Sequence, residues 1–159
     1  MSNYVVDTNI LAAANGKATH LSESDFMKCC QFLKTFFEKK QNHISIDSIG
    51  LIFREYLNNA SLAGRPGIGD SFLKWLFSNR ANTSICESVC INPVSDSEYD
   101  FREFPNDIDL VGFDKSDKKF VAVAIASKKS PEICNACDSD WNDYAEALKK
   151  HGVKILNII

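Results

Sequence analysis

The residues of this chain best suited to chemistry are acidic side chains that follow predicted strands, flank a helix start or, in one case, lie within a helix. They are Asp7, Glu55, Asp114, Asp117, Asp138 and Asp140. Grouped carboxylates offer the oxygen ligands that a hard divalent cation such as Mg²⁺ or Mn²⁺ prefers, and they leave coordination positions open for water. Whether these acids can meet depends on the elements that carry them.

The first of these acids follows a predicted strand. Residues 4–6 are aromatic and β-branched, and Asp7-Thr8-Asn9 is a sequence typical of turns, which ends the strand before an alanine-rich helical stretch. Ligands of open α/β sheets bind at the carboxyl ends of the strands. Asp7 is therefore either a site residue or the N-cap of the next helix.

Helix and strand patterns alternate along the rest of the chain. The predicted strands are residues 4–6, 43–46, 86–94, 132–136 and 153–158. The predicted helices are residues 22–41, 70–80, 117–127 and 138–151, together with a helix that ends at residue 62. Asp47 or Ser48 is the expected N-cap of the helix that ends at residue 62, and Ser116 is the expected N-cap of helix 117–127. This alternation predicts a three-layer α/β/α domain with a mainly parallel central sheet and helices on both faces.

A parallel sheet would bring several of the acids to one edge. Asp7 ends the first strand, and Asp138 and Asp140 follow the predicted strand 132–136. The carboxyl ends of these strands lie at the same edge of a parallel sheet. We therefore expect these acids to face a common space.

The other acids lie on helices. Asp114 and Asp117 flank a helix start, where the helix dipole favours a carboxylate. Glu55 lies within a helix among apolar neighbours, so it must be paired, exposed or metal-bound. Each acid taken singly also fits a structural role, either as a helix cap or as a solvated side chain. The joint pattern favours a metal site.

The composition indicates a single domain over residues 1–159, with an extended connection at about residues 85–113. The chain is 45% hydrophobic, which is enough for a core. Its longest strongly apolar run, residues 120–126, is far shorter than the roughly 20 residues that cross a bilayer, and no signal-peptide pattern is present. We therefore expect a cytoplasmic protein that makes no contact with membranes. The acid- and aromatic-rich part of the connection, residues 95–114, has no clear period and is unusual enough to suggest a function.

Net charge and cysteines narrow the functional classes. A net charge of −3 disfavours a stoichiometric nucleic-acid binder but is compatible with an enzyme. The six cysteines are expected to be reduced thiols, mostly small buried side chains. The alternative is a zinc site, but the Cys134/Cys137 pair has CxxC spacing whereas Cys86 and Cys90 are spaced CxxxC.

The motifs around the acids resemble those of PIN-domain ribonucleases, and among these the toxins of bacterial VapBC-type toxin–antitoxin pairs. Residues 5–11 (VVDTNIL) resemble the first-strand motif, Glu55 the acid of the central helix, residues 116–126 the helix of the third acid, and residues 135–141 (NACDSDW) the fourth-acid motif. The chain departs from the pattern at residues 135–137, where a threonine is common, and in its longer connection after residue 85.

This resemblance implies an Mg²⁺- or Mn²⁺-dependent endoribonuclease that cleaves RNA phosphodiester bonds by activating a bound water. The implied metal ligands are Asp7, Glu55, Asp117 and Asp138, with Asp140 as a fifth member and Asp114 as the competitor of Asp117. Thr8 or Asn9 resembles the small polar residue that holds the first acid.

The resemblance also implies partners. Family members commonly dimerise and are held inactive by an antitoxin, so we expect an RNA substrate, a homodimer and an antitoxin protein. The aromatic-rich helical segments around residues 26–37 and 72–77 are candidate contact surfaces. Lys115, Lys118 and Lys119 are candidate phosphate contacts. Trp141 could stack on a base, although burial in the core is the favoured interpretation.

Two other functions fit parts of the pattern. A phosphotransfer domain also places an Asp after its first strand, but the dehalogenase type requires a second Asp where this chain has Asn9. A PIN-like module without catalysis, acting only in binding, is the stronger alternative. The retention of mutually repelling carboxylates argues against it.

Overall fold

The protein is built around a five-stranded sheet in which every strand runs parallel to its neighbours, in the order β3-β2-β1-β4-β5. The structure is a computed structural model and describes residues 2–159. The strands are β1 (Ser2–Val6), β2 (Asn42–Asp47), β3 (Cys86–Val89), β4 (Glu132–Asn135) and β5 (Ile155–Asn157). The predicted α/β class with a mainly parallel sheet is confirmed.

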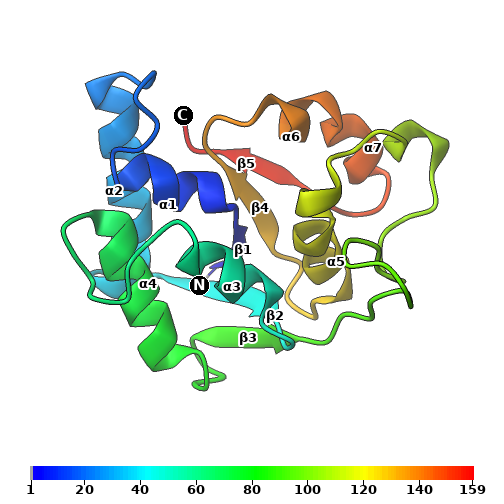
Figure 1. Cartoon of the computed structure of the whole chain (residues 1–159), viewed down its shortest axis with the longest axis horizontal. Helices are drawn as coiled ribbons and strands as arrows, with labels where there is room; N and C mark the ends of the chain where they lie inside the picture. Colours follow the sequence, from blue (N-terminus) through cyan, green and yellow to red (C-terminus); the bar gives the residue numbers. More distant parts are fainter. Residues whose placement is uncertain (1) are drawn as a thin grey trace.

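Helices cover both faces of this sheet and form a three-layer arrangement (Figure 1). The α-helices are α1 (Thr8–Ala14), α2 (Glu23–Phe37), α3 (Leu51–Leu57), α4 (Ile68–Asn79), α5 (Lys118–Ala126), α6 (Ser139–Asp143) and α7 (Ala145–Lys149), and the 3₁₀-helices are η1 (Ile108–Leu110) and η2 (Lys115–Asp117). Helices α1, α2 and α4 contact one another on one side, while α5 crosses β2, β1 and β4 on the other. Helix α3 contacts both α1 and α5.

The strand order places a topological switch point between β1 and β4. The chain leaves β1 toward β2 and β3 on one side, and it returns through α5 to β4 and β5 on the other. Val6 pairs with Cys134, and the Asp7 amide extends this ladder by donating to the Cys134 carbonyl at 3.1 Å. Ligands of open α/β sheets bind at such a point. The residues that follow β1 and β4 are therefore held side by side.

The helix after β2 is shorter than the sequence predicts. Helix α3 begins at Leu51, after Gly50 in the left-handed region at φ 85°, and it ends at Leu57 rather than at residue 62. Asp47 still caps it, because its carboxylate accepts from the backbone amides of Leu51 and Ile52 at 2.8 Å each. The left-handed turn at Gly50 thus separates the capping residue from the helix it caps.

Two further element predictions are wrong in detail. The expected helix 138–151 is broken at Tyr144 into α6 and α7. Ser116 does not cap α5, because it lies inside η2 and donates its own amide to Asp114 at 2.9 Å. Other ends shift by a few residues: α2 ends at Phe37, β3 ends at Val89 and β5 is limited to Ile155–Asn157.

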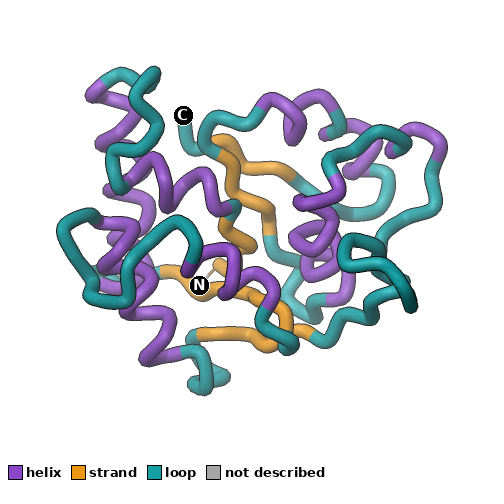
Figure 2. The backbone as a smooth tube through the Cα atoms, in the orientation of Figure 1, coloured by secondary structure: helices purple, strands orange, loops and turns teal. Residues whose placement is uncertain are grey.

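The long connection after β3 is mostly irregular, and it is packed against the domain. It crosses the side of the molecule that carries α5 and α7 (Figure 2). Pro93 and Phe101 form an isolated antiparallel bridge, and Phe101, Leu110 and Phe113 are buried. Buried apolar side chains therefore hold this segment against the domain, and its regular structure is limited to the short 3₁₀-helix η1.

The aromatic residues of α2 and α4 pack mainly against each other. The Phe36 ring lies 5.4 Å from Phe72 and 5.9 Å from Trp75, measured between ring centroids. Met27 and Phe77 are the large apolar side chains of these helices that remain exposed. Most of the aromatic surface expected to serve as a partner contact is thus used inside the domain.

The Asp47 cap provides a test of how the fold positions α3. Replacing Asp47 with Ala leaves two backbone amides of α3 without an acceptor, and we expect a loss of about 1–2 kcal/mol in the free energy of unfolding. Urea denaturation measures this loss. Ser48→Ala is the matched control, since Ser48 is exposed and should change little. Equal effects of the two substitutions would contradict the assigned cap.

Candidate metal centre

Three aspartates from separate parts of the chain meet at the switch point. Asp7 follows β1, Asp117 lies between η2 and α5, and Asp138 follows β4. One carboxylate oxygen from each lies within 4.8 Å of those of the other two. Asp7 and Asp117 are 4% and 7% exposed, and Asp138 is half-buried. Within residues 2–159 this is the one group of three or more acidic, histidine or cysteine side chains arranged to hold a metal ion.

Asp7 serves as both a helix cap and a member of this group. Its Oδ1 accepts the Asn9 amide at 3.2 Å, which caps α1. Its Oδ2 accepts from the Asn9 side chain at 3.2 Å and from the indole Nε1 of Trp141. The two interpretations of Asp7 that the sequence leaves open therefore coincide in one side chain.

Asparagine side chains connect the segments that carry Asp7 and Asp138. The side-chain Nδ2 of Asn9 donates to Asn135 Oδ1 at 2.9 Å, and Asn9 Oδ1 accepts the backbone amide of Ala136 at 3.0 Å. Asn135 Oδ1 also accepts the Asp138 amide at 3.1 Å, and its nitrogen donates to the Asp138 carbonyl at 2.9 Å. The separation of the two carboxylates is therefore fixed by hydrogen bonds as well as by the sheet.

The structure separates the roles of the two acids before α5. Asp114 is exposed and caps η2 by accepting from the amide and the hydroxyl of Ser116 at 2.9 Å each. Asp117 makes no side-chain capping bond at the start of α5. Because Asp114 caps this turn, the Asp117 carboxylate is available to the group.

The pKa values of two aspartates in this group, Asp117 and Asp7, are strongly raised. Burial raises the pKa of Asp117 from 3.8 to about 8, and the negative charges of Asp7, Asp114 and Asp138 add to the shift. Burial also raises the pKa of Asp7 to about 6, even though its bonds to Trp141 and Asn9 favour the ionised form. Among residues 2–159 no ion pair compensates the charge of Asp7, Asp117 or Asp138. A divalent cation with oxygen preference fits that deficit and the donor set.

Glu55 lies beside the group but outside it. Its carboxylate accepts the Thr8 hydroxyl and forms an ion pair of 2.6 Å with Lys119, whose ammonium group also donates to the Ser116 carbonyl. Both side chains of the ion pair are mostly buried, at 26% and 12% exposure. Its bond to Thr8, the residue that follows Asp7, places it near the group, and its charge contributes to the raised pKa values of Asp7 and Asp117.

Asp140 also lies at the margin of the group. It stands in the first turn of α6, and its amide donates to Asp138 Oδ1 at 2.9 Å. Partial burial and the charges of Asp138 and Asp114 raise its pKa. Of the six acids selected from the sequence, the structure thus brings together three and places Glu55, Asp114 and Asp140 around them.

Of the residues that orient the acids, sequence reasoning named Thr8 or Asn9 as the one that holds the first acid, and Asn9 does bond to Asp7, but it missed the others. Trp141 is buried, as expected, but the hydrogen bond from its indole to Asp7 was not predicted. The bonds of Asn135 to Asn9 and of Lys119 to Glu55 were also missed. A polar side chain at the last position of a strand, such as Asn135 in β4, is a weak signal for such a role, because its partner lies 126 residues away.

The cysteines take no part in a metal cluster within the described chain. All six are free thiols, and Cys90 and Cys137 are exposed rather than buried. Comparison of the chain with family models, curated proteins and solved structures gives no match. The case for a function therefore depends on the residues of the site.

The raised pKa values predict how the metal-free protein responds to pH. A carboxyl with a pKa of about 3.8 when unfolded and about 6 or 8 when folded binds more protons in the folded state. The stability that Asp7 and Asp117 contribute is therefore full below about pH 4 and is lost as the pH rises through their folded-state pKa values. We expect a melting temperature several degrees higher at pH 5 than at pH 8.5 in EDTA.

Asp117→Asn should flatten this pH dependence, since it removes the group with the larger shift. Mn²⁺ should raise the melting temperature of the wild-type protein more at pH 8.5 than at pH 5, because protons compete with the metal. Differential scanning fluorimetry measures both effects. A wild-type melting temperature that increases from pH 5 to pH 8.5 in EDTA would contradict the assigned shifts.

Proposed function

We propose that this protein is a metal-dependent endoribonuclease of the PIN-domain kind, and that Asp7, Asp117 and Asp138 hold Mg²⁺ or Mn²⁺. The observation that carries the proposal is the convergence of three carboxylates from separate elements at the switch point of the sheet. A purely structural use of these acids does not require them to face one another. A shared cation accounts for their proximity.

In this proposal the residues of the site have different roles. Trp141 and Asn9 orient the Asp7 carboxylate, while Asn135 fixes the backbone that carries Asp138. The cation, when bound, would lower the pKa of a bound water and offset the charge that develops on the phosphate. Lys119 lies beside the carboxylates and can contact a substrate phosphate.

Glu55 is proposed as a further ligand on the basis of the resemblance. In the structure its carboxylate is paired with Lys119, so metal coordination by Glu55 requires this ion pair to loosen. The loss of the ion pair would free the Lys119 ammonium group for a phosphate. If Glu55 exchanged Lys119 for the metal, the metal would therefore gain a ligand and the substrate phosphate would gain a positive contact.

RNA as substrate, together with the toxin role, follows from the resemblance to the toxins of VapBC-type pairs. Support comes from the motif order and from the meeting of three of the four acids that the resemblance implies. We extend the proposal to a toxin of a toxin–antitoxin or defence system, with a homodimeric state and an antitoxin partner. The chain within residues 2–159 forms no helix long and apolar enough to cross a membrane.

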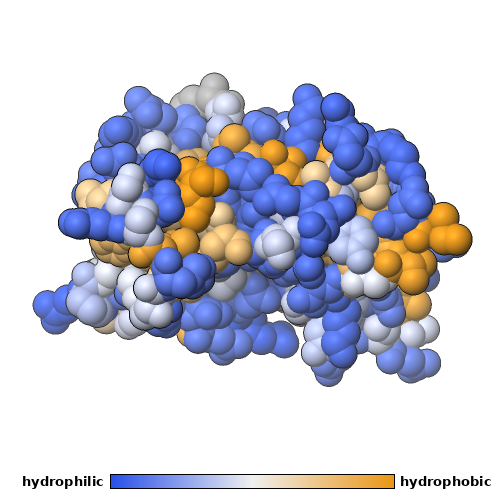
Figure 3. Space-filling model, turned by 90° about the horizontal axis from the view of Figure 1, so that it is seen from above, coloured by the Kyte–Doolittle hydropathy of each residue, from blue (hydrophilic) through white to orange (hydrophobic). Residues whose placement is uncertain are grey.

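A candidate surface for the protein partners lies away from α2 and α4. Ile108 and Val111 are 85% and 75% exposed, which is unusual for aliphatic side chains. Figure 3 shows apolar residues gathered at the end of the molecule where α7 and the segment before α5 lie. We propose this end as the first place to search for the dimer or antitoxin contact.

The ion pair of Glu55 with Lys119 favours one alternative function. A lysine that offsets part of the acidic charge lets the chain fold without a metal, as a catalytically silent binding module would require. Such a module would keep its partner binding when the acids are neutralised. The nuclease would lose its activity instead.

Cleavage assays distinguish these functions. Purified protein should cut a mixed pool of tRNA and single-stranded RNA with Mn²⁺ or Mg²⁺ and should not cut it in EDTA. Asp7→Asn and Asp138→Asn should each reduce the rate by more than about a hundredfold, since altering residues that only support metal ligands already costs roughly 10- to 100-fold. Gel analysis of the cleaved RNA measures the rates.

Glu146→Gln is the matched control, because Glu146 is an exposed acid of α7. Its variant should cut RNA at the wild-type rate. Circular dichroism must show that all variants retain the fold. Metal-independent cutting, or cutting that survives Asp7→Asn, would refute the proposed centre.

A further inference from the structure

A cavity of about 410 Å³ opens beside the candidate metal centre. Its volume lies within the range of roughly 300–1,000 Å³ that small-molecule sites occupy. Glu55 and Lys119, which border the aspartates, also line this cavity. The cavity and the group of aspartates therefore share Glu55 and Lys119 as a common border.

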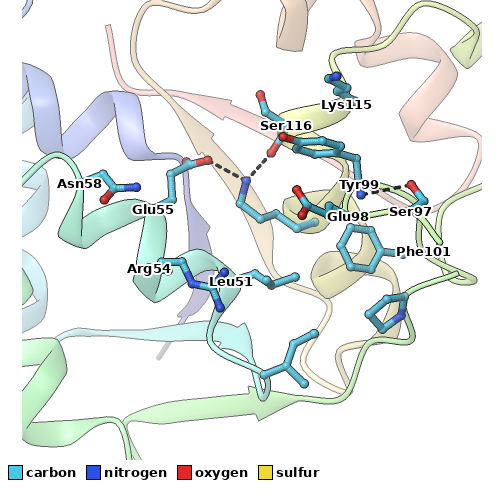
Figure 4. Close-up of a pocket in the computed structure, with 13 residues that line it drawn as sticks. Leu51, Arg54, Glu55, Asn58, Ser97, Glu98, Tyr99, Phe101, Lys115 and Ser116 are labelled. Carbon is cyan, nitrogen blue, oxygen red and sulfur yellow. Dashed lines mark hydrogen bonds and ion pairs between the residues drawn. The ribbon is translucent and has the colours of Figure 1, made fainter. Parts of the chain in front are cut away.

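Two segments far apart in the sequence form the walls of the cavity. Figure 4 shows Leu51, Arg54 and Glu55 of α3 on one side and Glu98, Tyr99 and Phe101 of the long connection on the other. The connection that the sequence leaves without regular structure thus supplies a wall next to the site. Besides packing against the domain, the segment therefore forms part of a cavity next to the site.

The second wall is aromatic and partly accessible. Tyr99 is 39% exposed and lines the cavity, and Phe101 is buried beside it. The Lys115 ammonium lies 4.7 Å from the centroid of the Tyr99 ring. A flat ring can stack on an aromatic side chain of this kind, which is how proteins hold unpaired bases of single-stranded nucleic acids.

Three positive groups (Arg54, Lys115 and Lys119) and two acids (Glu55 and Glu98) line the same cavity. Arg54 and Lys115 form no ion pair within residues 2–159, and Lys119 pairs only with Glu55. Cations placed around an aromatic wall suit a ligand that combines a flat base with phosphates. An apolar peptide would leave these charges without partners.

We infer that this cavity binds the nucleobase next to the scissile phosphate, with Tyr99 stacking on the base and with Arg54 and Lys115 contacting neighbouring phosphates. The inference rests on the proposed function, because the metal centre sets the position of the scissile phosphate. It adds a substrate class, namely RNA with an unpaired base at the cleavage site. Tyr99 is thereby a specificity residue rather than a catalytic one.

A binding cycle tests this inference without relying on cleavage. The Asp7→Asn protein, kept in EDTA, is titrated into a short fluorescein-labelled single-stranded RNA and into an all-abasic oligomer of equal length. Tyr99→Ala should weaken binding of the RNA by about tenfold and leave the abasic oligomer unchanged, since the stack needs a base. Tyr99→Phe should bind both as the parent does. Fluorescence anisotropy measures the dissociation constants.

Val94→Ala is the matched control, because Val94 is an exposed residue of the same connection that does not line the cavity. Melting temperatures must show that Tyr99→Ala is folded. Equal losses for RNA and abasic oligomer, or no loss for either, would overturn the inference. Failure of the protein to bind RNA at all would overturn it as well.

The same variants separate this inference from the proposed nuclease. If wild-type protein cuts RNA with Mn²⁺ and the cycle shows no coupling between Tyr99 and the bases, the nuclease stands and the base site is wrong. If the coupling is present and no preparation cuts RNA, the base site stands and the nuclease is wrong.

Discussion

Repulsion among three aspartates that share a largely buried space is the constraint on which the site depends. Burial and the neighbouring charges raise the pKa of Asp117 to about 8. The surroundings offset only part of this cost, through the Trp141 indole and the Asn9 side chain on Asp7. No buried side-chain polar atom in the described part of the chain lacks a hydrogen-bond partner. The remaining deficit is therefore one of charge, which a divalent cation can supply.

The fold makes this arrangement possible through the strand order. Because β4 pairs directly with β1, residues 126 or more positions apart in sequence, such as Asn9 and Asn135, can bond across the switch point. Helix α5 brings Asp117 to the same place from the opposite layer of the domain. The acids therefore come from three elements whose relative positions are fixed by the core rather than by the site.

How much of the site is predictable depends on the range of the interactions. The strand before Asp7 and the capping of the next helix by Asp7 were predictable, because propensity and capping are local, but the turn expected at residues 7–9 is absent since α1 begins at Thr8. The role of Asp114 as a cap for η2, which leaves Asp117 available, depends on a turn that has no distinct sequence pattern. The bond from Trp141 to Asp7 spans 134 residues, and no local rule predicts its partner. The break at Tyr144 was also missed, since residues 138–151 keep a helical pattern through it.

The most direct test of the account is the position of a bound metal. Crystals of the wild-type protein grown at about pH 8 with Mn²⁺ should show an anomalous difference peak among the carboxylates of Asp7, Asp117 and Asp138, and the peak should be absent in crystals of Asp117→Asn. Such a peak would place the cation where the buried charge requires it. A Mn²⁺-saturated crystal without a peak at these carboxylates would contradict the central claim.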